Sequence, residues 1–211
     1  MNNDNTYTPK AEELLKPTPA QAAKTASKKK ISDFFDWCEI IAVSLIFVII
    51  LFMYCFKVVR ISGDSMLETL HTNEMVVITD LGYTPKSGDI VVISRNVENS
   101  AETMSESDGP IIKRVIATEN QEVDIKNGKV YVDGKELVED YLTYSYTAPG
   151  EVKFPVTVPK GHIFVLGDNR LNSLDSRSPN IGNNGMVDSR YVLGHAVYRV
   201  FPLNQAGSLK K

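Results

Sequence analysis

The sequence is poor in the residues that build metal centres and disulfide frameworks. It has two cysteines, Cys38 and Cys55, and three histidines, and none of them shows the spacing of a zinc site. On one helix the two cysteines would lie about 25 Å apart, too far for a disulfide bond. The spacing therefore predicts no disulfide and no zinc site; we also expect a chain that uses no other metal ion and no cofactor.

A strong excess of one charge is also missing. The 211 residues carry a formal net charge of −3, which argues against a nucleic-acid partner. Hydrophobic residues make up 43% of the chain, enough for a sizeable core, so wholesale disorder is excluded.

One long stretch carries no charge. Ile40–Phe56 lacks charged side chains, and Trp37–Phe56 would form a helix about 30 Å long, matching the hydrocarbon core of a bilayer. A cleaved signal peptide is the weaker interpretation, because no small-x-small cleavage site follows Phe56. A buried core helix would show a polar face, whereas this stretch has only Ser44 and Tyr54. We expect a single membrane-spanning helix over residues 37–56.

Basic residues near this span predict its orientation. Four lysines precede the span and two basic residues follow it: Lys24, Lys28, Lys29 and Lys30 against Lys57 and Arg60. The positive-inside rule then places the N-terminus in the cytoplasm and the following domain outside the cell membrane. We expect a disordered cytoplasmic tail over residues 1–36, an extracytoplasmic domain over 57–203 and a short tail over 204–211.

The extracytoplasmic domain is expected to be mainly antiparallel β-sheet. Short runs of β-branched residues alternate with turn residues, and Asn127-Gly128 and Asp133-Gly134 are typical of hairpin turns. The acidic stretch Asn96–Pro110 is predicted to be a solvated loop. The predicted strands are Met75–Thr79, Asp89–Arg95, Ile111–Thr118, Glu122–Lys126, Lys129–Val132, His162–Leu166 and Gly194–Phe201.

A candidate nucleophile, Ser65, follows the span closely. In Ser62-Gly63-Asp64-Ser65-Met66, small residues permit a sharp turn that exposes the hydroxyl and directs backbone N–H groups at a reacting carbonyl. Taken alone, such a string is most often an ordinary turn.

A candidate base, Lys113, lies between aliphatic residues of a predicted strand. In Ile111–Ile116 each face of the strand would carry one cation, Lys113 or Arg114, between two aliphatic side chains. An edge-strand lysine would keep its charge in water. A lysine enclosed by an apolar wall would have a lowered pKa, and its neutral amine could deprotonate a serine.

A third stretch, Gly167–Arg177, is polar and follows the apolar strand His162–Leu166. A polar loop beside a buried strand needs an internal network of hydrogen bonds and ion pairs, or else it is a functional site. In such a network Asp175 and Arg177 could pair with each other or with Arg114.

Together these stretches resemble the type I signal peptidases, the membrane-anchored Ser/Lys proteases of bacteria. The resemblance extends from the span to Pro202, and the order of the motifs is typical of that family. The matching motifs are Ser65-Met66 with Thr69-Leu70, Gly88-Asp89-Ile90-Val91, Lys113-Arg114-Val115-Ile116, Gly167-Asp168-Asn169-Arg170, Asn172-Ser173, Asp175-Ser176-Arg177 and Gly194-His195-Ala196.

The resemblance implies a role for each matching residue. Ser65 would be the nucleophile and Lys113 the general base, and Ser173 would donate a hydrogen bond that orients the lysine. The backbone at Ser65 and Gly63 would form the oxyanion hole, and Met66 and Asp64 would contact substrate. Supporting roles would fall to Arg114, Asp175 and Arg177 as an ion-pair network, and to Asp168, Asn169 and Arg170 as the loop that holds Ser173.

The resemblance also implies partners and a location. The substrates would be secretory preproteins with small residues before the cut, and membrane lipid would surround the anchor. The fold would be a largely antiparallel β domain with a nonpolar face on the membrane.

The chain departs from the family pattern at three places. Glu68 stands where the family usually has proline, so a carboxylate could lie near the cleft. Gly63 stands where some members carry a hydroxyl that serves the oxyanion hole. Glu119-Asn120-Gln121 replaces a common Pro-Gly-acid turn, which survives because Asn120 tolerates a positive φ.

Two other functions compete with a Ser/Lys protease. A serine hydrolase that uses His71, His162 or His195 would need a carboxylate orienter beside the histidine, and no motif supplies one. A catalytically silent relative that assists the assembly of surface proteins would be expected to lose Ser65 or Lys113, and both are present.

Overall fold

The computed structural model describes residues 19–94 and 109–209, which belong to two compact units. The first unit ends at Phe52 and the second begins at Met53. Most of the predicted loop Asn96–Pro110 lies outside the described residues, as do residues 1–18 of the predicted tail.

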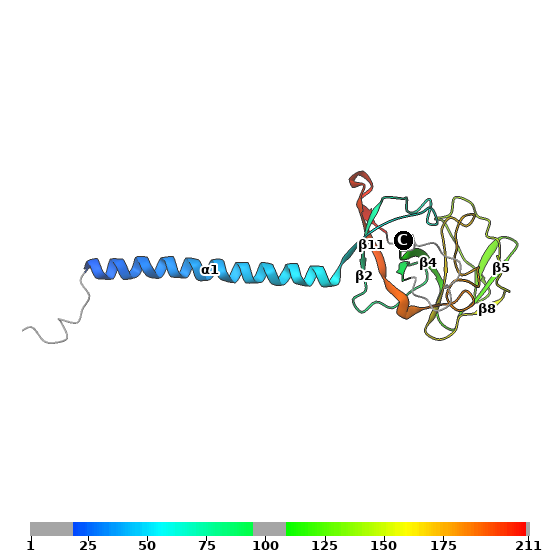
Figure 1. The fold of residues 1–211 in the computed structure, drawn as a ribbon, viewed down its shortest axis with the longest axis horizontal. Helices are drawn as coiled ribbons and strands as arrows, with labels where there is room; N and C mark the ends of the chain where they lie inside the picture. The colour runs from blue at the N-terminus through cyan, green and yellow to red at the C-terminus, as the bar shows by residue number, and fades with distance from the viewer. Residues whose placement is uncertain (1–18, 95–108, 210–211) are drawn as a thin grey trace, which may run out of the picture. The chain divides into compact units, whose positions relative to one another are not determined.

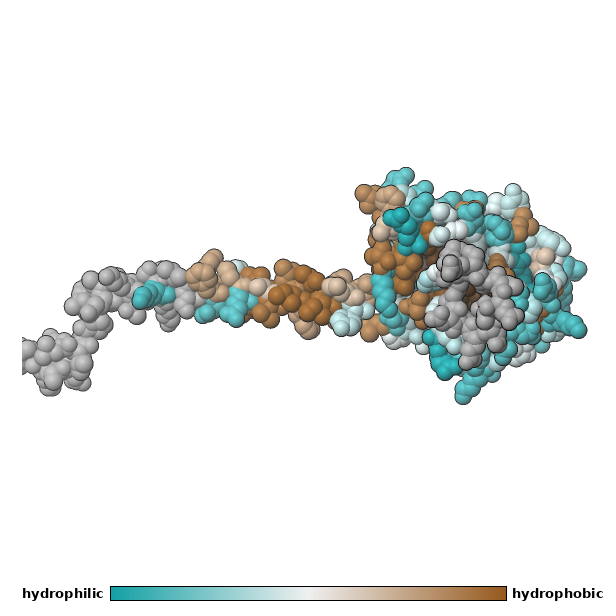
Figure 2. Space-filling view, viewed as in Figure 1, coloured by the Kyte–Doolittle hydropathy of each residue, from teal (hydrophilic) through white to brown (hydrophobic). Residues whose placement is uncertain are grey.

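The first unit is built on one long helix, α1, over Pro19–Cys55 (Figure 1). Its part over Asp33–Cys55 is long and apolar enough to cross a membrane, and its side chains are exposed there. Figure 2 shows apolar residues gathered along this part of the helix. The prediction of a disordered tail is wrong for residues 19–36, because alanine, glutamine and lysine favour helix and Pro19 is well placed at a first helical position.

The second unit contains two antiparallel sheets, as predicted. The larger has the order β1-β2-β11-β3-β4-β9-β10, with β12 paired to β11. Its strands are β1 (Lys57–Arg60), β2 (Met75–Thr79), β3 (Ile90–Ile93), β4 (Ile111–Ala117), β9 (His162–Leu166), β10 (Val187–Asp188), β11 (Val192–Phe201) and β12 (Gly207–Ser208).

The smaller sheet has the order β7-β6-β5-β8. Its strands are β5 (Glu122–Lys126), β6 (Lys129–Val132), β7 (Lys135–Glu136) and β8 (Val156–Thr157). Asn127 and Asp133 adopt a positive φ in the two tight turns that join β5, β6 and β7, which confirms both predicted hairpins. Asn120 also has a positive φ, as its turn requires.

After α1 ends at Cys55, helical structure in the described part of this unit is limited to two short 3₁₀ segments, Ser189–Tyr191 and Leu203–Gln205. The predicted tail over 204–211 is wrong in part, because Gly207 and Ser208 pair with Arg199 and Tyr198 of β11.

Strand β4 lies in the interior of the large sheet, between β3 and β9. Apolar clusters cover both of its faces: Ile112 belongs to one, Val115 to a second and Ile116 to a third. Lys113 and Arg114 are each 3% exposed, so the interpretation of Lys113 as an edge-strand lysine that keeps its charge in water is excluded.

Candidate active site

The turn that carries Ser65 is anchored by its apolar neighbours. After β1, Ile61 is still hydrogen-bonded to the β2 side of the sheet, through Glu74 and Asn73. Met66 and Leu70 are buried in the same cluster as Ile61, and Leu70 N–H donates to Met66 O over 2.8 Å. Because the residues after Ser65 point into the core, the Ser65 hydroxyl is held toward the surface.

Lys113 meets this hydroxyl from β4. Its side chain is buried, with 3% of the residue exposed, and its Nζ donates to Ser65 Oγ over 2.7 Å. Nζ also donates to the carbonyl oxygen of Ile112 over 3.0 Å. Burial disfavours the charged form of an amine, and a neutral amine at this distance can accept the hydroxyl proton.

A cleft of about 450 Å³ opens beside the Ser65–Lys113 pair. Its walls come from β1, β3, β4 and β10, so the large sheet curls until its β1 edge approaches β4. The lining residues central to the argument below are Val59, Arg60, Ile61, Asp64, Ile111 and Leu174.

The loop after β9 binds the nucleophile turn directly. Asn169 N–H donates to Ser65 O over 3.0 Å, and its side-chain amide donates to Asp64 O over 3.0 Å. Gly167 passes so close to the turn that a Cβ there would collide with Ser65 O, at 2.5 Å, and with Ser173 Oγ. Only glycine permits this approach, which explains the residue type at the start of the motif.

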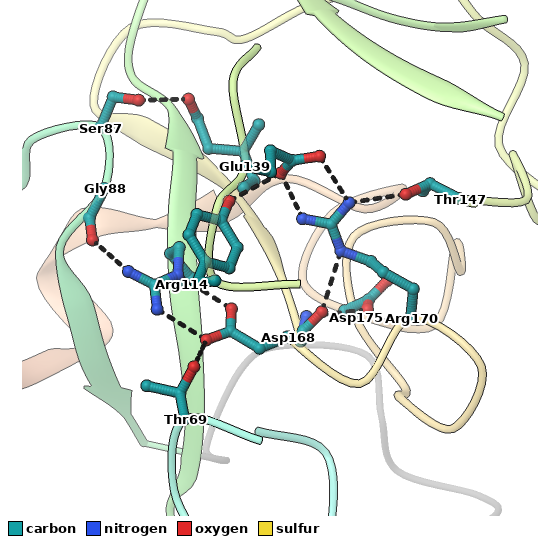
Figure 3. A network of polar contacts seen from close by, with 12 residues as sticks. Thr69, Ser87, Gly88, Arg114, Glu139, Thr147, Asp168, Arg170 and Asp175 are labelled. Atoms are coloured by element: carbon teal, nitrogen blue, oxygen red, sulfur yellow. Dashed lines mark hydrogen bonds and ion pairs between the residues drawn. The ribbon is translucent and has the colours of Figure 1, made fainter. Parts of the chain in front are cut away.

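Arg114 and Asp168 form the central ion pair of the site (Figure 3). Arg114 donates to both carboxylate oxygens, over 2.9 and 2.6 Å, and to Gly88 O over 2.9 Å. Asp168 also accepts the Thr69 hydroxyl over 2.5 Å. The alternative in which Asp175 or Arg177 pairs with Arg114 is therefore wrong. Asp168, predicted to shape its loop, also links β4 to the nucleophile turn through Arg114 and Thr69.

Asp175 and Arg177 form a second, separate pair. Arg177 donates to both carboxylate oxygens over 2.8 and 2.9 Å, and both residues are buried. Asp175 also accepts Gly167 N–H over 3.0 Å, so the pair fixes the start of the loop after β9. The alternative that Asp175 and Arg177 pair with each other is confirmed.

A third cluster joins this loop to the segment after β7. Arg170 donates to Glu139 over 3.0 Å, to Thr147 over 2.6 Å and to Gly167 O over 3.0 Å (Figure 3). The Tyr141 hydroxyl donates to Glu139 over 2.6 Å, and the Tyr141 ring stacks on Arg114 with Cζ 3.8 Å from its centroid. Burial, together with the Glu139 carboxylate, raises the pKa of Tyr141, which keeps it a hydrogen-bond donor.

Sequence reasoning missed Glu139, Tyr141 and Thr147. They lie in a stretch without regular strand structure, and nothing in their spacing indicates that they meet Arg114 and Arg170. Arg114 and Arg170 offered the one available signal for these three residues. A buried guanidinium requires several hydrogen-bond acceptors, and the motifs quoted above do not supply all of them.

Ser173 does not make the predicted hydrogen bond to Lys113. Its Oγ is buried and has no hydrogen-bond partner in the part of the chain that the structure describes. The hydroxyl instead packs against Gly167. Lys113 Nζ donates instead to Ser65 Oγ and to Ile112 O.

The predicted oxyanion and substrate residues have mixed outcomes. Gly63 adopts a φ of 92° and lines the cleft with Asp64 and Ser65. The Ser65 backbone N–H makes no hydrogen bond within residues 19–94 and 109–209, so it can receive an oxyanion. Met66 is 1% exposed and lies in the core, so its predicted contact with substrate is wrong in this structure.

Glu68 and the histidines lie away from the Ser65–Lys113 pair. Glu68 is exposed on the side of the turn that faces Asn169 and Leu171, outside the lining of the cleft, so the expectation of a carboxylate near the cleft is wrong. His71 lies near Glu68 and Glu74. His195 stacks on Tyr83, and His162 contacts Lys160 O. His71 therefore does have carboxylates beside it, but among the described residues no hydrogen bond joins any of the three histidines to Ser65, whose Oγ is bonded to Lys113.

Comparison with known proteins agrees with this geometry. The sequence model of the family described as "Signal peptidase, peptidase S26" matches residues 34–201. The chain belongs to the signal peptidase family. It is 31% identical over 197 residues to signal peptidase I T of Bacillus subtilis, covering 89% of this chain and 95% of that protein.

Two further relatives match parts of the chain. A probable signal peptidase I-1 of Synechocystis is 34% identical over 176 residues, covering 81% of this chain and 84% of that protein. The crystal structure of a signal peptidase I from Enterococcus faecalis matches with a TM-score of 0.41 and 29% identity, covering 54% of this chain and 97% of that one.

Proposed function

We propose that this chain is a signal peptidase I, a serine endopeptidase that removes signal peptides from secretory preproteins. The observation that carries the proposal is the hydrogen bond of 2.7 Å between the buried Lys113 Nζ and Ser65 Oγ, found in a member of the signal peptidase family. Signal peptidases act on preproteins, which supplies the substrate class.

The proposed reaction is acyl transfer through Ser65. The neutral amine of Lys113 takes the hydroxyl proton while Ser65 Oγ attacks the peptide carbonyl. The backbone N–H of Ser65 donates to the resulting oxyanion, with the Gly63 region as the adjoining wall. Protonated Lys113 then gives its proton to the leaving amine. Water activated by the same amine hydrolyses the ester and regenerates Ser65.

Two strands that line the cleft favour an extended substrate. β1 is the edge strand of the large sheet, and on β4 the register with β9 begins at Arg114, after Ile111 and Ile112. A preprotein segment can therefore add as a strand, with small residues against the apolar wall formed by Val59, Ile61 and Ile111.

The supporting residues are proposed to hold the two reacting groups in register. Arg114 and Asp168 join the Lys113 strand to the Ser65 turn, and Asn169 holds the backbone of that turn. Asp175, Arg177 and Arg170 fix the loop that presents Asp168 and Asn169. Asp64 is proposed to contact substrate because it is exposed at the cleft.

We further propose that α1 anchors the protein in the cell membrane. Its apolar part, Asp33–Cys55, has the required length, and the excess of lysines before the span favours a cytoplasmic N-terminus and an extracytoplasmic second unit.

The test is cleavage of a preprotein by the purified full-length chain in detergent. We expect the product to begin at the residue after a small-x-small sequence, as read by N-terminal sequencing, and Ser65→Ala to give no product. A folded parent protein that cleaves no preprotein would instead favour the silent assembly factor.

A further inference from the structure

The substrate cleft carries an unpaired positive charge on its rim, at Arg60. Arg60 is exposed, ends strand β1 and lines the cleft. Within residues 19–94 and 109–209 its side chain makes no hydrogen bond and no ion pair. The other basic residue of β1, Lys57, is paired with Asp80 over 3.2 Å and does not line the cleft.

The backbone of Arg60 faces the open edge of the sheet. The neighbouring Ile61 donates its N–H to Glu74 O over 2.8 Å and accepts from Asn73 over 2.9 Å. Because hydrogen-bonding direction alternates along a strand, the N–H and C=O of Arg60 point away from β2. An added substrate strand would therefore pair with the backbone at Arg60.

Side chains of β1 divide between two faces. Val59 and Ile61 pack into the apolar cluster below the cleft, and Ile61 is 2% exposed. Arg60 lies on the opposite face, toward solvent. A substrate strand paired with β1 would place its small residues on the Val59 and Ile61 side. Its alternate residues would then share the face of Arg60 as cross-strand neighbours.

The other charged residues of the cleft lining bear on which substrate side chain Arg60 would favour. Lys113 lies at the base of the cleft, bonded to Ser65, and the exposed Asp64 is the described carboxylate on the same lining. Asp64 accepts the Thr72 hydroxyl over 3.2 Å and lies beside Ser65 rather than on β1. Among residues 19–94 and 109–209, no carboxylate pairs with the positive charge on the β1 rim, so a substrate carboxylate can complement it.

We propose that Arg60 is a specificity-determining residue. It favours an acidic side chain, and disfavours a basic one, at the outward-facing positions of the bound preprotein segment. In a bound strand, the first and third residues before the cut are the small ones that face the apolar wall. The outward-facing positions are therefore the second and fourth residues before the cut. The inference rests on the proposed function and deepens it by naming a charge preference of the substrate.

The test compares matched peptides that carry Glu, Gln or Lys at the second or fourth position before the cut. The full-length protein is assayed in a neutral detergent at low salt, and kcat/KM is measured. We expect the parent to prefer Glu over Gln and Gln over Lys, by about two- to fivefold per step at one of these positions. Arg60→Gln should abolish the preference, and Arg60→Glu should reverse it.

Two matched controls isolate the charge at the cleft. Arg60→Lys should keep the preference, since it retains the charge, and Lys57→Gln should also keep it, since Lys57 lies on the same strand but outside the cleft. Raising the salt to about 1 M should shrink the preference in the parent, because the Debye length falls to about 3 Å.

The outcomes separate the inference from the proposed function. If the parent cleaves none of the peptides, the proposed function fails and the inference falls with it. If all variants cleave with the same order of preference, the inference alone is overturned. An Arg60→Gln effect that appears only in vesicles of anionic lipid, and equally for all peptides, would show that Arg60 meets lipid headgroups and would also overturn it.

Discussion

At the scale of the residue, the proposed chemistry depends on an amine that can lose its proton. Lys113 is enclosed on β4, and its contacts with Ser65 Oγ and Ile112 O hold Nζ in one position. Burial of an amine costs stability when it is charged and much less when it is neutral. Burial of the Lys113 amine therefore lowers the stability of the folded chain somewhat, and it also makes the neutral amine available as a base.

Substitution of the two groups should separate catalysis from folding. Ser65→Ala and Lys113→Met should each lower kcat/KM by more than about 10³-fold while the protein stays folded. Lys113→Met keeps the volume and removes a buried polar group, so its thermal midpoint should equal or exceed that of the parent. Preprotein cleavage and thermal melts in the same detergent measure both effects.

Lys113→Arg is the sharper variant. A guanidinium stays protonated at any usable pH, so it cannot accept the Ser65 proton. We expect less than about a tenth of the parent activity. A folded Lys113→Arg protein with more activity than that would rule out a lysine base.

The pH profile provides an independent check on the same amine. Only neutral Lys113 is active in the proposed reaction, so kcat/KM should rise with pH. Below the pKa of the amine it should fall about tenfold per pH unit. Because burial favours the neutral form, we expect the rise to centre below about 10.4, the ordinary value for lysine.

This profile needs a control for unfolding, which thermal melts across the same pH range supply. Activity that is already flat from pH 6 upward, in a protein that melts alike throughout, would argue against lysine as the base.

Single residues differed in how far the sequence could place them. Ser65 and Lys113 lie in local patterns, a small-residue turn and an apolar strand, that were ambiguous on their own. The family resemblance proposed their roles, and the structure brings the two side chains within 2.7 Å. Met66 and Ser173 were misplaced because their surroundings are set by distant segments: Met66 is buried in the core, and Ser173 packs against Gly167.

At the scale of the element, the loop after β9 links the catalytic strand and the nucleophile turn. Its Asp168 binds Arg114 and Thr69, while its Asn169 binds Ser65 O. Asp175 binds Arg177 and also accepts the N–H of Gly167, so this pair holds the first residue of the loop in place. Loss of this pair should therefore disturb the whole site through the fold rather than through the chemistry.

Asp175→Asn should destabilise the protein strongly. It leaves the buried Arg177 without a carboxylate, which costs about 3 kcal/mol or more. For a domain of this size that is a fall of roughly 6–12 °C in the thermal midpoint. Glu136→Gln is the control, because it removes an exposed pair with Lys129 and should shift the midpoint by less than about 3 °C. An Asp175→Asn protein that melts like the parent would show that the carboxylate has no structural role.

Strands that carry a local sequence pattern were predictable. Short strands and segments whose structure depends on contacts with distant parts of the chain were not. β2, β5, β6 and β9 follow β-branched runs and tight turns, and their predicted limits match the structure residue for residue. Short strands such as β7 and β10 depend on a neighbour for their pairing and carry no signal of their own. The Glu139–Thr147 segment meets Arg170 through contacts between distant parts of the chain, which periodicity does not encode.

At the scale of the whole molecule, the proposed anchor and the proposed protease are separate units with one function. α1 ends at Cys55, and all strands of the second unit lie after it. At most about 3.5 Å per extended residue, Ser65 lies within roughly 30 Å of Phe56 along the chain. A membrane-anchored enzyme of this kind is placed close to substrates that are themselves held at the bilayer.

Removal of residues 1–56 tests this division of labour. The truncated protein keeps every strand, so cleavage of a soluble peptide should stay within about twofold of the parent. Cleavage of a precursor inserted in vesicles should fall more than about tenfold, because enzyme and substrate no longer share one membrane and their effective concentration drops. Both proteins are assayed on both substrates under the same conditions. An equal loss on both substrates would mean that α1 serves the folding of the second unit, and the proposal that the anchor places the protease at its substrate would fall.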